Sequence, residues 1–535
     1  MKISCEHKRY LLFFLASAVF LFITSHNSFL YAINDSEDVN CFTTSANLLL
    51  SGKQAYKDFF EQKGPIVYWI HAVILYLYPD SYHGLYFLEV ICAFFYHVYN
   101  YKILKLILKD SSDKKLTILC LLSCGLTYTS SCISKGGEIE EYLLPLFSYL
   151  LYHMLKTFMS EQEPKKAPCI YTGIHAAIIF WTKYFALLMH IVCLVILTIM
   201  LLKNKQGKKL CKILLFCIIG FLSVSVPIII YFAAENSLSD LIRVYFHDNI
   251  FIYNIDDPTG PMGMVMIFTT IIACYVTEFV EYLNFVNLLF IAALLIAANN
   301  IKAIKEKYDK KTIHLFSILI YAMPLGIILI GKKTWSYYMI PVLALSPFLV
   351  TVCSHSIKTK RLAAVGSVLT IILSVTLSLI LTKPFDAIKS RQQIAAMIKP
   401  NSDLIVLNKM DDGYFMMTHN IPDRYYFTLT NCHKSEIQDL YRTLIEAKQT
   451  DYVIYYGADP AMPHKTELLQ KDITDTINIR KKLRYNNYTE IACISLYDTD
   501  YNCIILFYKN DKLSSANDSF LTERGYTNVF YSKFV

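Results

Sequence analysis

Charged residues are scarce in this sequence of 535 residues, which excludes most soluble folds. Asp, Glu, Lys and Arg make up 18% of the chain, hydrophobic residues make up 55%, and the mean hydropathy is +0.38. A soluble domain has about 25% charged residues. The apolar residues fall into runs of about 18–25, the length that a helix needs to cross a hydrocarbon core. These runs lack the alternation of barrel strands, so a helical membrane protein is predicted.

Recognisable metal-binding patterns are also missing. The chain has 15 cysteines, many of them within apolar runs, and no C-x-x-C pair accompanied by a matching His pair. Such cysteines behave as small hydrophobic residues, and a zinc site is not expected. No cofactor is therefore predicted, although oxygen ligands in an acidic loop could hold a divalent metal. The net charge of +8 is explained by basic cytoplasmic loops, so no nucleic-acid partner is expected.

The apolar runs predict about eleven transmembrane helices. The first run lacks a small-residue cleavage site and is interpreted as a retained helix rather than a signal peptide. A shorter segment at 65–78 is expected to lie along the membrane surface, and another near 264–278 to lie flat or dip in. The predicted spans are 10–32, 84–107, 116–133, 141–158, 169–182, 184–202, 210–233, 281–299, 312–331, 337–354 and 362–382.

The distribution of basic residues predicts the orientation. With the N-terminus in the cytoplasm, every predicted inside loop carries Lys or Arg, as the positive-inside rule requires. These loops are 102–115, 160–167, 203–209, 301–311 and 354–361. The chain is thus expected to be a multi-pass protein of the inner (plasma) membrane, in contact with membrane lipids. Its first loop and its C-terminal segment would lie on the extracytoplasmic side.

The C-terminal segment differs in composition from the rest of the chain. It is polar and contains strand-like runs at 403–408, 451–456 and 503–509, separated by helix-like and turn-rich segments. Two domains are therefore predicted: a transmembrane domain at 1–384 and a small extracytoplasmic α/β domain at 385–535. The second is of ordinary domain size.

The first loop, residues 33–64, carries the most informative pattern. By composition alone, its charges could simply solvate the loop. However, an acid, an aromatic residue and a "G…Y.D.F..KGP" pattern follow one another here, ending at the predicted surface helix. The matching residues are Asp38, Phe42, Gly52, Tyr56, Asp58, Phe59, Lys63, Gly64 and Pro65. This loop resembles that of the GT-C superfamily, which includes protein O-mannosyltransferases and aminoarabinose transferases, in its Lys-Gly-Pro variant.

A second segment strengthens the likeness. "GGEIEEYLLP", at 136–145, is similar to the acidic turn that these relatives carry before the fourth span. The resemblance implies a GT-C-like membrane glycosyltransferase, which transfers a hexosyl or pentosyl group. The donor would be a polyprenyl-phosphate-linked sugar, and the acceptor a lipid, a glycan or a protein. The "SED" sequence departs from the simpler pattern of the relatives and leaves Asp35 as an alternative to Asp38.

The residue types suit this chemistry. An acceptor hydroxyl is a poor nucleophile and needs a positioned carboxylate as base. Asp38 is expected to fill this role, with Asp35 and Asp58 as the other catalytic candidates. Fixed cations would stabilise the leaving lipid phosphate. The expected substrate-binding residues, all near the outer ends of predicted spans, are Lys63, Glu140, Glu141, Lys183, Lys332, Lys333, Tyr337 and Tyr338.

Other interpretations of these residues stay open. Lys183 could snorkel from a hairpin tip to the membrane interface, and Glu140 and Glu141 could solvate a loop. Lys332 and Tyr337, with their neighbours, could form an interfacial anchor. The whole chain could instead be a transporter or a lipid-handling protein without catalysis. Transporters usually show repeated halves and broken helices at the midplane. Here the charges gather at the outer surface, which favours an enzyme.

Overall fold

The computed structural model describes most of the chain. The described ranges are 5–253 (without 131–132, 134 and 160–164), 336–351 (without 349), 384–430, 435–457, 467–495 and 503–509, with single positions between 265 and 319 and at 372. Apart from those single positions, the predicted segments 264–278, 281–299, 312–331 and 362–382 lie outside the described residues, as do Lys332 and Lys333.

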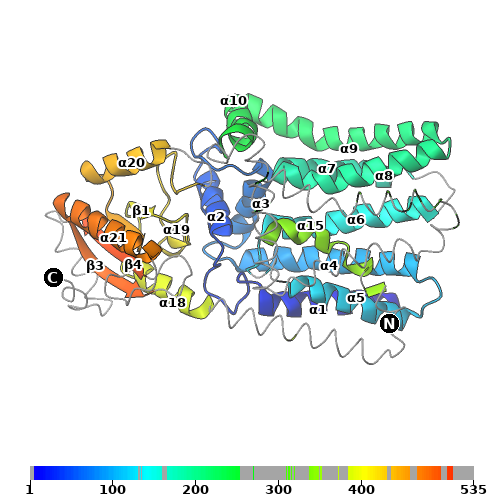
Figure 1. Ribbon diagram of the computed structural model, residues 1–535, viewed down its shortest axis with the longest axis horizontal. Helices are drawn as coiled ribbons and strands as arrows, with labels where there is room; N and C mark the ends of the chain where they lie inside the picture. The colour runs from blue at the N-terminus through cyan, green and yellow to red at the C-terminus, as the bar shows by residue number, and fades with distance from the viewer. Residues whose placement is uncertain are drawn as a thin grey trace.

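A bundle of long helices forms one end of the molecule, and a small sheet forms the other (Figure 1). The bundle helices are α1 (Cys5–Thr24), α4 (His83–Ile107), α5 (Asp113–Tyr128), α6 (Ile139–Met159), α7 (Lys166–Lys183), α8 (Leu188–Lys203) and α9 (Gly207–Ala234). Each overlaps a predicted span, with differences at the ends. By length and composition, three described segments could cross a membrane: Cys5–Thr24, Lys166–Lys203 and Gly207–Ala234. The count of eleven stays a prediction.

The first predicted span was too long. Helix α1 ends at Thr24, and the chain then turns through Ser25, Asn27 and Asn34, which are all buried. These side chains hydrogen-bond within the fold; the amide of Asn34, for example, donates to the Gly136 carbonyl at 3.1 Å. Since buried polar groups need such partners, the segment folds as a polar turn rather than as more helix.

Two glycines let α7 and α9 pack closely. A Cβ at Gly173 would lie 1.9 Å from the carbonyl oxygen of Cys217, and one at Gly220 would lie 2.0 Å from that of Ile170. Small residues at such crossings are typical of membrane helices. Helix α7 ends where Lys183 adopts an extended backbone (φ −156°, ψ 88°), and a short turn, η2 (Tyr184–Leu187), leads into α8.

The first loop contains a helix that was not predicted, α2 (Glu37–Leu50). Ser36 caps it by accepting a hydrogen bond from the Val39 amide. The helix predicted at 65–78 is observed as α3 (Pro65–Leu77), which begins with proline in its first turn, a favoured position. Its place along the membrane surface stays a prediction. Both helices lie between the bundle and the C-terminal segment (Figure 1). Shorter elements nearby are α10 (Leu238–Leu241), the π-helix η3 (Ile242–Ile252), η4 (Ser336–Met339) and α15 (Ile340–Leu343).

The C-terminal segment forms a four-stranded sheet in the order β1-β2-β4-β3. The three predicted strands are observed as β1 (Leu404–Leu407), β2 (Tyr452–Gly457) and β4 (Cys503–Lys509), whereas β3 (Tyr488–Ser495) was not predicted. Strands β1 and β2 are parallel, and the other pairs are antiparallel. The accompanying helices are α18 (Pro384–Ala395), α19 (Tyr414–Met417), α20 (Ser435–Glu446) and α21 (Glu467–Tyr485).

The two faces of this sheet have different neighbours. Side chains alternate along a strand, so successive residues point to opposite faces. Val453 belongs to a cluster with Tyr441 of α20 and Leu483 of α21. The next residue, Ile454, belongs instead to a core that continues through Phe59 of the first loop into the bundle. The sheet and the loop that carries the motif therefore share one continuous core.

Candidate active site

The Lys-Gly-Pro motif fixes the backbone around Lys63. The hydroxyls of two buried tyrosines, Tyr56 and Tyr68, donate to the Lys63 carbonyl at 2.6 and 2.9 Å. The carboxylate of Asp58 accepts a hydrogen bond of 2.7 Å from the backbone N–H of Gln54 and so closes the preceding turn. Asp58 itself is exposed. The motif residues thus fix the conformation of the loop. Asp58 stabilises a turn of this loop and is not part of the buried cluster described below.

Gly64 brings the first loop against the end of α7. Its amide donates to the Thr182 carbonyl at 3.0 Å, and a Cβ on Gly64 would lie 2.0 Å from the Trp181 carbonyl oxygen. Only glycine permits this approach. The consequence is that Lys63, which precedes Gly64, and Lys183, which follows Thr182, come to the same place although 120 residues separate them in the sequence.

Both lysines line a cavity of about 50 Å³. Its walls come from the loop before α3, from the end of α7, from η3 and from η4, and many of the lining groups are polar. The lining residues are Gln62, Lys63, Thr182, Lys183, Tyr184, Phe185, Tyr245, Asn249, Tyr253 and Tyr338. Two ammonium groups with two side-chain amides and several phenols nearby form a suitable environment for an anion, because hydrogen bonds between charged groups are stronger than those between neutral groups.

Asp38 lies beside this cavity in the first turn of α2. Its Oδ2 is 3.6 Å from Nζ of Lys63, and both side chains are buried. That oxygen has no hydrogen-bond partner among the described residues. Burial alone would lower the pKa of Lys63, but the nearby carboxylates of Asp38 and Glu61 outweigh it and raise this pKa above its ordinary value. Lys63 is therefore a fixed cation, and its ammonium group lies beside a carboxylate oxygen of Asp38 that accepts no hydrogen bond within the described ranges.

Lys183 pairs with Glu140, which stands in the first turn of α6. The distance between Nζ of Lys183 and Oε1 of Glu140 is 2.5 Å, and both side chains are at most 5% exposed. Three aromatic rings surround the same ammonium group, at 4.6 to 5.0 Å from their centres: Phe185, Tyr337 and Tyr338. A lysine held in this way is neither snorkelling nor solvated. The structure thus joins Lys63, Glu140, Lys183, Tyr337 and Tyr338 around Asp38.

Glu138 is a member of this group that sequence reasoning missed. Its Oε1 accepts a hydrogen bond of 2.8 Å from the Ser36 hydroxyl, next to Asp38. Burial, followed by repulsion from Asp38 and Glu140, raises the pKa of Glu138 to about 7. The only sequence signal was its place at the start of the acidic run. Glu141 points elsewhere and accepts from the Gly137 amide at 3.0 Å.

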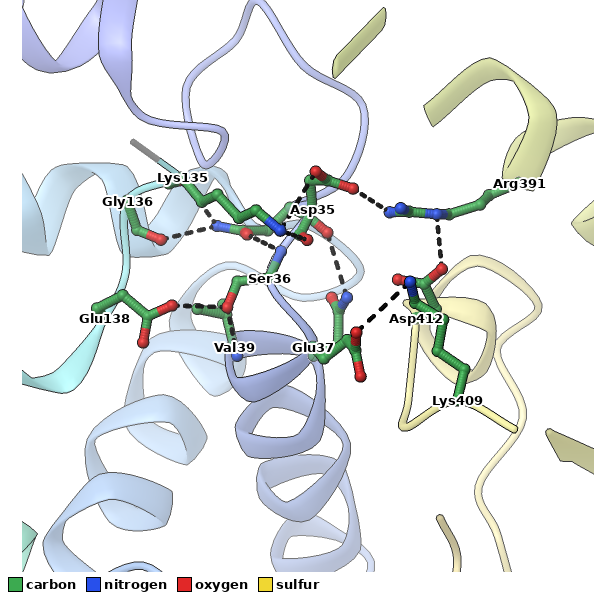
Figure 2. Close-up of polar contacts among 12 residues, drawn as sticks. Asp35, Ser36, Glu37, Val39, Lys135, Gly136, Glu138, Arg391, Lys409 and Asp412 are labelled. Carbon is green, nitrogen blue, oxygen red and sulfur yellow. Dashed lines mark hydrogen bonds and ion pairs between the residues drawn. The ribbon is translucent and has the colours of Figure 1, made fainter. Parts of the chain in front are cut away.

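Asp35, the alternative to Asp38, belongs to a different network, drawn in Figure 2. Its Oδ1 lies 2.5 Å from Nη1 of Arg391, and its Oδ2 lies 3.5 Å from Nζ of Lys135. Nε of Arg391 also reaches Asp412, at 2.7 Å. Although burial opposes it, the charges of Lys135 and Arg391 lower the pKa of Asp35 well below its ordinary value. Asp35 is therefore an ion-paired carboxylate that joins the first loop to α18.

Arg391 was not predicted as a site residue. It is 3% exposed and comes from the C-terminal segment. Beside it, Lys409 lies 3.5 Å from Glu37, also across the boundary between the two predicted domains. No local pattern marks these residues, since their partners lie hundreds of positions away. Within the described ranges, no group of three or more His, Cys, Asp or Glu side chains is placed to hold a metal ion.

Comparison with known proteins supports the GT-C assignment. A profile of the dolichyl-phosphate-mannose-protein mannosyltransferase family matches residues 62–231. Two crystal structures of ArnT from Cupriavidus metallidurans share the fold. The apo form has a TM-score of 0.58 and 11% identity, over 94% of this chain and 98% of ArnT.

The form bound to undecaprenyl phosphate has a TM-score of 0.57 and 10% identity, over 94% of this chain and 97% of ArnT. No curated protein matches the sequence significantly. The likeness to ArnT extends over nearly the whole chain, well beyond the segment that the family profile covers. The resemblance found in the first loop is thus supported, and the chain shares the fold of ArnT.

Proposed function

We propose that this protein is a membrane glycosyltransferase that takes its sugar from a polyprenyl-phosphate-linked donor on the extracytoplasmic face. The observation that carries the proposal is the meeting of Lys63 and Lys183 on one cavity, with Asp38 3.6 Å from Lys63. The undecaprenyl phosphate bound to ArnT, a protein of the same fold, supports a donor of this class.

The roles follow from charge and position. The two ammonium groups would hold the donor phosphate and stabilise its growing negative charge as the glycosidic bond breaks. Asp38 would accept the proton of the attacking acceptor hydroxyl, with its carboxylate oriented by Lys63 at 3.6 Å. Such a base typically contributes about 10²–10⁴-fold to the rate.

Glu138 and Glu140 would support this arrangement without touching the reacting atoms. Glu140 holds Lys183 in place at 2.5 Å. Glu138 bonds to Ser36, the cap of the helix that presents Asp38. Asp35 would stabilise the contact between the first loop and α18, and Asp58 would stabilise the turn that begins at Gln54. The acceptor would be a lipid, a glycan or a protein, and the transferred group a hexose or a pentose.

Two measurements on the same variants test the proposal. In membrane vesicles containing native lipid-linked sugars, Asp38→Asn should lower transfer by at least about 100-fold. Binding of undecaprenyl phosphate to the purified protein should persist in that variant. In contrast, Lys63→Gln combined with Lys183→Gln should weaken binding.

Asp423→Asn is the matched control, because Asp423 forms an exposed ion pair with Lys53 in the same region. It should leave both transfer and binding unchanged. Full transfer by Asp38→Asn would refute its role as the base. Unchanged binding by the double lysine variant would refute the phosphate site.

A further inference from the structure

A second and much larger cavity lies within the helix bundle, among α6, α7, α8 and α9. Its volume is about 360 Å³, within the usual size range of small-molecule sites. Most of its lining is apolar, from Leu150 and Met154 on α6 to Leu197 on α8 and Phe221 on α9. None of its lining residues belongs to the group around Asp38. The cavity is therefore a feature separate from the proposed active site.

The cavity opens at the end of the bundle opposite the C-terminal sheet. Lys156, near the end of α6, and Lys165, just before α7, both line it and are exposed. On α7 its lining extends from Pro168 to Ala176, which is about 12 Å along a helix. Since α7 ends at Lys183, these residues occupy the half of the membrane away from Asp38. The orientation predicted from the basic loops makes this the cytoplasmic half.

Positive charge is concentrated at this opening. Lys102 and Lys156 both lie against the ring of Tyr152, at 5.8 and 5.9 Å from its centre. Lys166 lies 5.6 Å from the ring centre of Phe216 on α9. The cytoplasmic leaflet carries anionic lipids, and basic pockets between membrane helices on that side bind anionic head groups. The opening is thus complementary in charge to the lipid surface that would surround it.

The interior also contains an unsatisfied polar side chain. His190 of α8 lines the cavity and is 7% exposed, and both of its ring nitrogens lack a hydrogen-bond partner among the described residues. A buried polar group without a partner is unfavourable. An occupant or a water molecule that reaches this imidazole would therefore be stabilised. An apolar cavity with a few polar groups is the usual form of a ligand site.

We propose that this cavity binds an anionic phospholipid of the cytoplasmic leaflet. An acyl chain would fill the space between α6 and α9, and the phosphate would lie between the ammonium groups of Lys156 and Lys165. The volume accommodates an acyl chain rather than a long polyprenyl chain. The site is independent of the proposed glycosyl transfer, because neither lysine belongs to the group around Asp38.

Native mass spectrometry of the purified full-length protein tests this site. Phosphatidylglycerol, phosphatidylcholine, undecaprenyl phosphate and inorganic phosphate are added separately. The wild type should retain phosphatidylglycerol at least about tenfold better than phosphatidylcholine, the difference that about 1.4 kcal/mol of charge interaction gives. Lys156→Gln with Lys165→Gln should abolish this preference. Lys109→Gln with Lys114→Gln is the matched control, since both lysines are exposed at the same end but do not line the cavity.

A cavity-filling variant provides a second, independent measurement. Ala176→Phe introduces bulk into the lining without changing charge, and it should lower retention of both phospholipids. Thermal melting of each variant confirms that it is folded. Equal phosphatidylglycerol retention by the wild type and the Lys156/Lys165 variant would overturn the proposal. So would displacement of the lipid by inorganic phosphate, or selective loss of undecaprenyl phosphate from the Ala176→Phe variant.

Discussion

Replacing Arg391 with leucine should destabilise the protein far more than any substitution of a surface arginine. Arg391 is buried and lies 2.5 Å from Asp35 and 2.7 Å from Asp412. Asp412 is completely buried, and Asp35 is 8% exposed. Removing the guanidinium leaves these two carboxylates in a water-poor site without the cation that they share. Breaking a buried ion pair on one side typically costs about 3–5 kcal/mol.

The assay is thermal unfolding of the purified protein in detergent, at one fixed scan rate because unfolding of such proteins is often irreversible. For a cooperative unit of about 150–250 residues, a loss of this size lowers the midpoint on the order of 10 °C. Arg442→Leu is the matched control. Its pair with Asp439 lies on the surface of α20, with both side chains more than half exposed. Such pairs contribute about 0–1 kcal/mol.

A rescue variant separates charge from packing. Arg391→Leu combined with Asp35→Asn and Asp412→Asn removes both stranded charges, and it should recover much of the lost midpoint. Equal midpoints for Arg391→Leu and Arg442→Leu would refute the reasoning. A triple variant no more stable than Arg391→Leu alone would show that lost packing, rather than stranded charge, accounts for the effect.

Three further predictions follow from single contacts. Gly64→Ala should abolish transfer, because its Cβ would lie 2.0 Å from the Trp181 carbonyl; Gly207→Ala, with nothing within 4 Å, should be neutral in the same vesicle assay. Glu140→Gln should lower the thermal midpoint, since it leaves the buried Lys183 ammonium without its counterion. Burial raises the pKa of Asp411 to about 7, so the folded chain keeps a proton that the unfolded chain releases between about pH 4 and pH 7. Stability should therefore fall as pH rises through this window, and Asp411→Asn should flatten the midpoint profile measured from pH 4 to pH 8.

The helices of the bundle could be predicted because each carries its own signal. A run of apolar residues long enough to cross the membrane specifies a helix without reference to the rest of the chain. Strand-like runs located β1, β2 and β4 for the same reason. Strand β3 has a mixed sequence that begins with Tyr488, Thr489 and Glu490, and its assignment depends on pairing with β4. Such pairing is tertiary information, which single-sequence patterns do not contain.

Helix α2 was not predicted, although the sequence contains a recognisable signal for its N-terminus. Ser36 followed by Glu37 and Asp38 is a helix N-terminus signal: a capping hydroxyl with acids in the first turn. The pattern predicted that these acids solvate the loop or take part in catalysis, and it did not predict their place at the start of a helix. Recognising the cap would have separated the two rival aspartates, since Asp35 precedes the cap and Asp38 lies within the helix.

The pairing of Lys63 with Lys183 marks the limit of sequence reasoning here. Topology predicted that both lysines lie on the outer side, but many lysines satisfy that condition. What brings these two together is the close approach of Gly64 to the end of α7. A resemblance identified the glycine, but its physical reason became visible only in the packing.

The two aspartates of the first loop therefore have different environments although only three positions separate them. Asp35 is neutralised by Arg391 and Lys135, and one of its neighbours comes from the C-terminal segment. The Oδ2 of Asp38 lies 3.6 Å from Lys63 and accepts no hydrogen bond within the described part of the chain. A carboxylate already bound to a guanidinium is a weak base, since the ion pair stabilises its charged form. This difference, set by where α2 begins, is what favours Asp38 over Asp35 as the base.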